Sequence, residues 1–253
     1  MICEDFSTGN SLLHRTDARI KIIAAFLFTL QTALHQTVTP TLMSLALGVV
    51  LIILSSISPA AILKRLLLVN GFTLFIWLTL PFTYPGETIV QLGFLKMSQE
   101  GTATALLITL KTNAALLGII ALLTTSTPAA IGHGLEKLHL PTRLCFILLF
   151  AYRYIFVIYD EYKTLLRAAK MRCFVPKSSM HTYRTFAYLF GMTLVRSHNR
   201  ASRIHQAMAL RGFDGKLISL KSHHINSSDL FLLFFLLAAL ALIGYTALSI
   251  HSL

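Results

Sequence analysis

The stretch "LFLLFFLLAALALIGYTALSI", residues 230–250, decides the fold class. It holds 21 consecutive residues without a charged side chain. A helix needs about 20 apolar residues to cross the ~30 Å hydrocarbon layer of a bilayer. This stretch is therefore predicted to be a transmembrane helix, and the chain a membrane protein.

The composition of the whole chain agrees with that class. Hydrophobic residues make up 55% of it and charged residues only 13%, with a mean hydropathy of +0.69. A soluble domain of this length carries far more charge. Twelve of the 22 basic residues lie between Lys163 and Lys221, where Asp214 is the only acidic residue. This placement favours one basic face on a membrane protein and argues against nucleic-acid binding.

Four more apolar stretches approach the length of a membrane span. They are residues 20–38, 41–57, 66–84 and 102–123. A sixth stretch, 144–159, is shorter and contains Arg153. An arginine at the centre of a span costs on the order of 3 kcal/mol, so we interpret 144–159 as a helix at the cytoplasmic interface. The predicted fold is an all-α polytopic membrane protein with about five transmembrane helices.

The distribution of lysine and arginine predicts the orientation. Basic residues flank the first span at its N-terminal side and follow the second and fourth spans, whereas loop 38–40 and the last three residues carry none. Cytoplasmic loops carry the excess of Lys and Arg. We expect the N-terminus inside, the C-terminus outside, and a multi-pass location in the cell (inner) membrane. The alternative is six spans, with the basic cluster of 160–228 outside.

This topology predicts three parts. Residues 1–125 form an N-terminal membrane domain with four spans, 126–228 a cytoplasmic module of amphipathic helices, and 229–253 the last span. In the module, Asp160 and Glu161 are expected to begin a helix. Two further helices are expected over 182–194 and 196–210, the second closed by Gly212.

The module repeats a short pattern. "RAAKMRCF" at 167–174 and "QAMALRGF" at 206–213 match in Ala, Arg and Phe. Helical spacing groups Leu165, Ala168 and Ala169 on the face of Arg172, and Ile204, Ala207 and Met208 on the face of Arg211. An arginine fork beside small residues suits a carboxylate in a partly desolvated groove. Two matched helices indicate two equivalent receptors, as a pair of ATPase subunits provides.

At these residues the chain resembles the T component (EcfT, CbiQ type) of energy-coupling factor transporters. The family's signature is a pair of Ala-Arg-Gly motifs, here "AAKMRCF" and "AMALRGF". "TTSTPAAIGHGLEKLHLP" (124–141) and "FILLFAYRYIFVIYDEYKTLLRAAKMR" (146–172) are also similar to the family. The first motif departs from the pattern, because Cys173 stands where the family has Gly, and this puts the turn after the first helix in question.

The resemblance implies a non-catalytic scaffold with several partners. Two cytoplasmic ABC-type ATPase subunits would bind ATP and Mg, and Arg172 and Arg211 would contact them. A separate, CbiM-like integral membrane subunit would capture the substrate. The CbiQ type implies cobalt import, and with it cobalamin biosynthesis, with nickel or a vitamin as the alternative. This chain itself would hold no cofactor, and its only other partner would be membrane lipid.

The remaining sequence features are weaker indicators of function. "RGFDGKL" at 211–217 has the wrong spacing for a phosphate-binding loop, and adjacent His223 and His224 do not form a metal-ligand pattern. Lys111, inside a predicted span, is either structural or a second coupling residue together with Arg153. A self-contained transporter would show repeated or broken spans, and a membrane enzyme would show clustered acids, His or Cys. We find neither pattern.

Overall fold

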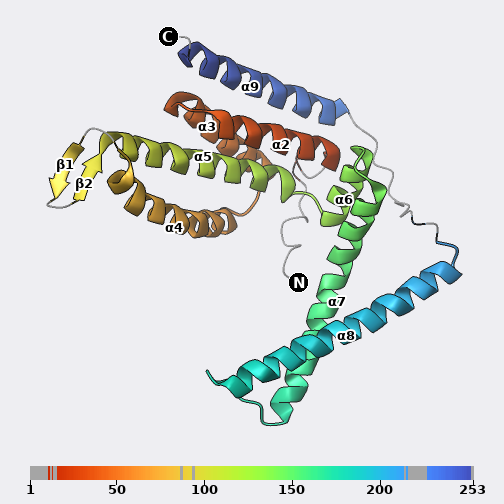
Figure 1. Ribbon diagram of the computed structural model, residues 1–253. Helices are drawn as coiled ribbons and strands as arrows, with labels where there is room; N and C mark the ends of the chain where they lie inside the picture. Colours follow the sequence, from red (N-terminus) through yellow and green to blue (C-terminus); the bar gives the residue numbers. More distant parts are fainter. Residues whose placement is uncertain are drawn as a thin grey trace. The chain divides into compact units, whose positions relative to one another are not determined.

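The computed structural model describes residues 11, 13, 16–85, 88–92, 95–213, 215 and 227–251. The predicted all-α class is confirmed, and a short antiparallel hairpin is added between two of the helices (Figure 1). Within the described residues the elements are α2 (Ala18–Leu34), α3 (Val38–Ser55), α4 (Pro59–Thr83), β1 (Thr88–Leu92), β2 (Leu95–Ser98), α5 (Gln99–Leu123), α6 (Pro128–Lys137), α7 (Thr142–Met171), α8 (Met180–Leu210) and α9 (Ser227–His251).

The chain forms two compact units. The first unit comprises residues 1–134 and 222–253, and the second comprises 135–221. The first therefore holds α2 to α5 and α9, and the second holds α7 and α8, with α6 at the boundary. The second unit falls inside the predicted module 126–228.

Five described helices are long and apolar enough to cross a membrane: α3, α4, α5, α7 and α9. Four of them correspond to the predicted spans 41–57, 66–84, 102–123 and 230–250. The predicted span 20–38 corresponds to α2, whose 17 residues rise about 26 Å. Because α7 also meets the length and hydropathy of a span, the prediction that 144–159 does not cross stays a prediction.

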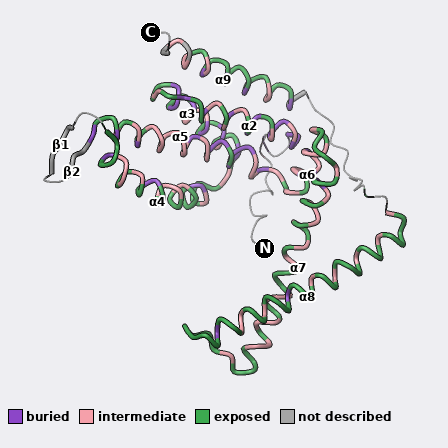
Figure 2. Tube along the Cα trace, viewed as in Figure 1, coloured by how far each residue is buried: buried purple, intermediate pink, exposed green. Residues whose placement is uncertain are grey.

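In the first unit, α5 is the central helix. It packs against α2, α3 and α4, while α9 packs against α2 and α3. Buried residues concentrate on α2, α3 and α5 (Figure 2). The approach of α2 to α5 depends on Gly118, because a Cβ there would lie 2.3 Å from the ring of Phe28, which is fully buried. A glycine at this point allows the two helices to come into direct contact.

The helices α2 and α9 run in the same direction. Near their first turns, the carboxylate of Asp229 is close enough to act electrostatically on Lys21. Further along, the side-chain Nε2 of Gln31 donates a hydrogen bond of 2.7 Å to the carbonyl of Leu240. Both helices therefore begin at the same end of the unit (Figure 1).

Two predictions about helix ends were wrong. Residues 142–171 form one continuous helix, so no helix begins at Asp160, and residues 180–210 form another, so 182–194 and 196–210 are not separate. Neither segment contains Pro at the expected break, and a helix interrupted without a breaker loses backbone hydrogen bonds. The helix α6 was not predicted, because its ten residues include two glycines.

Candidate functional site

The first copy of the repeat ends α7 with a defined turn. Arg172 is the C-cap, and Cys173 has a positive φ of 64°. The amide of Phe174 donates to the carbonyl of Ala169 at 3.2 Å, and the amide of Cys173 donates to Lys170 at 3.0 Å. This pair of hydrogen bonds is the Schellman motif.

The second copy ends α8 in the same way. Arg211 is the C-cap, and Gly212 has a φ of 72°. The amide of Phe213 donates to Met208 at 3.1 Å, and that of Gly212 donates to Ala209 at 3.0 Å. Cys173 thus takes the left-handed conformation that Gly212 takes, although a residue with a Cβ does so at a cost of about 1–2 kcal/mol. The imperfect match in sequence leaves the turn intact.

Each helix end presents a cation beside an apolar side chain. Arg172 and Arg211 are both exposed. The residue before each arginine is apolar and almost fully solvent-accessible, with Met171 81% and Leu210 90% exposed. Neither guanidinium has an ion-pair partner among the described residues. The two helix ends therefore have the same surface composition, an exposed apolar side chain next to an exposed cation.

The phenylalanine after each arginine packs onto the opposite helix. The ring of Phe174 lies 5.6 Å from that of Phe186 on α8, and the ring of Phe213 lies 5.4 Å from that of Phe146 on α7. Aromatic pairs at such distances stabilise packing by about 1 kcal/mol. Each turn is therefore fixed by the other helix as well as by its own hydrogen bonds.

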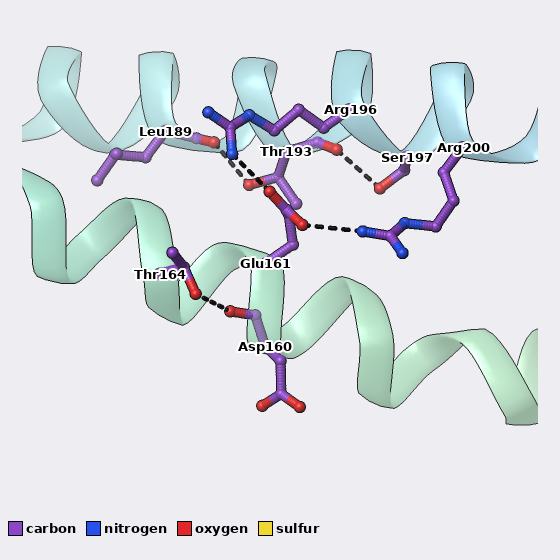
Figure 3. Close-up of polar contacts among 8 residues, drawn as sticks. All are labelled: Asp160, Glu161, Thr164, Leu189, Thr193, Arg196, Ser197 and Arg200. Atoms are coloured by element: carbon purple, nitrogen blue, oxygen red, sulfur yellow. Dashed lines mark hydrogen bonds and ion pairs between the residues drawn. The ribbon is translucent and has the colours of Figure 1, made fainter.

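The two helices cross at a charged pair (Figure 3). Glu161 on α7 accepts hydrogen bonds from Arg196 and, at 3.1 Å, from Arg200 on α8. Beside it, the rings of Tyr162 and Phe190 stack at 5.1 Å. Aligning Arg172 with Arg211 also aligns Glu161 with Arg200, since each lies eleven residues before its arginine. The crossing thus joins equivalent positions of the two copies.

The other predicted contact residues lie near the two ends. Ala207 and Gly212 are exposed. The other five are half-buried: Leu165, Ala168, Ala169, Ile204 and Met208. The structure does not bring Arg172 and Arg211 together, because they end different helices that diverge from the crossing (Figure 1). The arrangement offers two separate contact points rather than one shared pocket.

Lys111 and Arg153 lie away from these ends. The Nζ of Lys111, on α5, donates a hydrogen bond of 3.1 Å to the carbonyl of Ala33 in the last turn of α2. A cation at the C-terminal end of a helix is favourable, because the last carbonyls lack partners. Arg153 is exposed on α7, with its guanidinium carbon 5.6 Å from the ring centre of Tyr154. The geometry of Lys111 supports the structural interpretation.

Sequence reasoning missed two charged contacts. Glu161 was read as the start of a helix, although its pairing with Arg196 and Arg200 could have been suggested by opposite charges on two adjacent amphipathic helices. Lys21 was read only as a topology signal, yet it is 1% exposed. Its spacing of four residues from Asp17 was the available sign that it is paired.

The described residues contain no group of three His, Cys, Asp or Glu side chains that could hold a metal ion. His223, His224 and most of the "RGFDGKL" stretch beyond Phe213 lie outside the described residues. The candidate site consists of the two exposed helix ends, each with an arginine and an apolar side chain.

The chain is similar in sequence to known proteins of one family. The family model CbiQ, cobalt transport protein, matches residues 9–223. The energy-coupling factor transporter transmembrane protein EcfT of Bacillus subtilis is 29% identical over 228 residues, which cover 85% of each chain. EcfT of Streptococcus equi is 25% identical over 226 residues, covering 85% of this chain and 84% of the relative, and EcfT of Listeria innocua is 27% identical over 232 residues, covering 85% of each. The chain belongs to the EcfT/CbiQ family, and is a multi-pass, non-catalytic transmembrane T component of an energy-coupling factor transporter.

Proposed function

We propose that this chain couples a pair of cytoplasmic ABC-type ATPase subunits to a substrate-capturing membrane subunit in an importer of cobalt ions. The observation that carries the proposal is the matched geometry of the two helix ends. Each end has an exposed arginine at the C-cap, an exposed apolar residue before it and the same Schellman turn after it.

Two equivalent ends fit two equivalent partners. In the proposed complex, Met171 and Leu210 enter apolar grooves, and Arg172 and Arg211 pair with carboxylates at their rims. Arginine is among the residues most enriched at interface hot spots. ATP and Mg would be bound by the ATPase subunits, and this chain would contribute contact and movement only.

The second unit also carries the exposed apolar surface that membrane partners need. Ile147 and Ile155 on α7 are about 60% exposed, and Tyr188 and Leu194 on α8 about 70%. An apolar surface of this extent is covered by lipid or by another protein. We assign it to the membrane interface and to the substrate-capturing subunit, which would be CbiM-like.

The parallel course of α2 and α9 supports the proposed orientation. Helices that cross a membrane in the same direction are separated by an odd number of crossings. The helices α3, α4 and α5 supply three, and a crossing by α7 alone would make four. The helix α8 is not among those apolar enough to add a fifth. This parity favours α7 and α8 on the side of the membrane where α2 begins, with the two termini on opposite sides. The basic residues of 160–228 favour the cytoplasm for that side, and so the N-terminus inside and the C-terminus outside.

The description of the matching family, cobalt transport protein, supports cobalt as the substrate. Nickel or a vitamin is the second candidate, because the EcfT relatives are named for energy coupling without a substrate. Uptake of radiolabelled cobalt, nickel and vitamins, each measured separately in cells that express the whole complex, distinguishes these candidates. Uptake of nickel or a vitamin without uptake of cobalt would overturn the cobalt assignment.

The coupling role is tested by reversing both arginines, Arg172→Glu together with Arg211→Glu. We expect the ATPase subunits to be lost from the purified complex and cobalt uptake to fall to background, because a fixed donor fork becomes an acceptor. The matched control is Arg167→Glu with Arg203→Glu, which reverses two exposed arginines on the same helices. Normal association and uptake in the first variant would refute the coupling role.

A further inference from the structure

The most deeply buried cation in the described part of the chain is Lys21, in the second turn of the first unit's α2. Its side chain is 1% exposed, and its Nζ donates a hydrogen bond of 2.9 Å to the Oγ of Ser126. Taking an ammonium group out of water costs several kcal/mol, which paired charges and hydrogen bonds must offset. Because Lys21 belongs to no catalytic arrangement, its burial at this cost needs another explanation.

Two carboxylates offset the charge of Lys21. Asp229, in the first turn of α9, and Asp17, the N-cap of α2, both lie close enough to attract it. Both acids are buried, at 3% and 5% exposed. Asp17 also accepts a hydrogen bond from the amide of Arg19 at 3.1 Å, so it is held by its own helix. We call Lys21, Ser126, Asp17 and Asp229 the Lys21 cluster.

The Lys21 cluster lies where the chain leaves and re-enters the first unit. Ser126 follows α5 and precedes Leu135, the first residue of the second unit, by nine residues. Asp229 follows Lys221, the last residue of that unit, by eight residues. The ammonium group of Lys21 thus donates a hydrogen bond to Ser126, at the start of one connection, and attracts the buried carboxylate of Asp229, just after the other.

We propose that Lys21 is a positioning residue that ties these two connections to α2, so that movement of α7 and α8 is passed to the membrane helices. The proposal rests on the coupling function proposed above and adds to it the point of transmission. Without the contacts of Lys21, the segments before α6 and before α9 would move with α7 and α8 while the membrane helices stayed in place. The ATPase subunits would then hydrolyse ATP without moving the membrane helices.

The test replaces Lys21 by methionine, of similar length and without charge, in the complex of this chain with its ATPase and substrate-capturing partners in proteoliposomes. The readout is radiolabelled cobalt taken up per ATP hydrolysed. We expect assembly and ATP hydrolysis to stay within about twofold of wild type and uptake per ATP to fall at least about fivefold, the lower end of ordinary coupling between sites. Unchanged uptake per ATP overturns the proposal.

A second variant covers a failure to fold, since Lys21→Met removes a cation from beside two buried carboxylates. Lys21→Met with Asp229→Asn removes the attracting charges together, a change that buried pairs often tolerate. It should assemble and show the same loss of uptake per ATP. Loss of assembly in the double variant as well would mean that the cluster serves folding only, and would overturn the proposal.

Conservative changes at Ser126 separate transmission from packing. Ser126→Thr keeps the hydroxyl acceptor and should keep uptake per ATP, whereas Ser126→Ala removes it and should lower the ratio. Equal ratios in the two variants would contradict the proposal.

Failure of the proposed coupling function gives a different result. In that case the variant with Arg172→Glu and Arg211→Glu would show normal uptake per ATP, independently of the result for the Lys21 variants. If wild type takes up no cobalt, the same ratio is measured with the substrate that the separate uptake measurements identify.

Discussion

At the scale of single residues, Cys173 is the most informative position. It adopts a φ of 64° at the place where the second copy has Gly212 at 72°. Sequence comparison of the two copies identified the mismatch but not its outcome, because a cysteine can end a helix in more than one way. The backbone hydrogen bonds and the packing of Phe174 decide the outcome, and they impose the left-handed turn.

We therefore predict that Cys173→Gly stabilises the protein. The substitution relieves the steric cost of the Cβ at positive φ, so unfolding in detergent should shift to higher temperature, by the equivalent of about 1 kcal/mol. Gly212→Ala introduces the same strain in the second copy and should destabilise by a similar amount. A lower midpoint for Cys173→Gly would show that the thiol contributes more than the turn costs.

At the scale of elements, the crossing of α7 and α8 depends on one carboxylate. Glu161 contacts both Arg196 and Arg200, whereas the neighbouring carboxylate of Asp160 points away from α8 (Figure 3). The two acids are adjacent in sequence but lie on different faces of one helix. Their roles differ for this geometric reason alone.

Substitution of Glu161 by glutamine should loosen the crossing. The amide keeps the shape but removes the charge that attracts the two guanidinium groups, so backbone amides of α8 near the crossing should exchange with deuterium faster. Asp160→Asn, which removes one charge from the same turn, should leave the exchange unchanged. Equal exchange in both variants would mean that Tyr162 and Phe190 hold the crossing without Glu161.

Much of this arrangement could be predicted from the sequence. The apolar runs located α3, α4, α5 and α9, and the repeat identified both helix ends, with Gly212 directly after the C-cap Arg211. The sequence analysis did not predict that α7 continues through Asp160 and α8 through Val195. At Asp160 the acidic pair is as compatible with the start of a helix as with a contact to another helix. The pairing of Lys21 with Ser126 joins residues far apart in the chain, and periodicity holds no information on such contacts.

At the scale of the whole molecule, the parallel course of α2 and α9 supports a topology in which α7 does not cross the membrane alone. The basic residues of 160–228 favour the cytoplasm as the side that holds α7 and α8. The proposed orientation needs both observations, because helix direction does not distinguish the inside of the cell from the outside.

Single cysteines test this topology in a background that lacks Cys3, Cys145 and Cys173. With Ser178→Cys, between α7 and α8, we expect labelling by a membrane-impermeant maleimide only after the cell is opened. With Pro85→Cys, which is exposed after α4, we expect labelling of intact cells. Labelling of Ser178→Cys in intact cells would place α7 across the membrane and overturn the orientation.

The position of the Glu161–Arg200 contact has a mechanical consequence. Eleven residues separate it from Arg172 on one helix and from Arg211 on the other, which gives two arms of about 16 Å each. Arms of equal length turn through equal angles when their tips are displaced equally. In the coupling function proposed above, a displacement of either helix end by its ATPase subunit would therefore turn that arm about the crossing through the same angle.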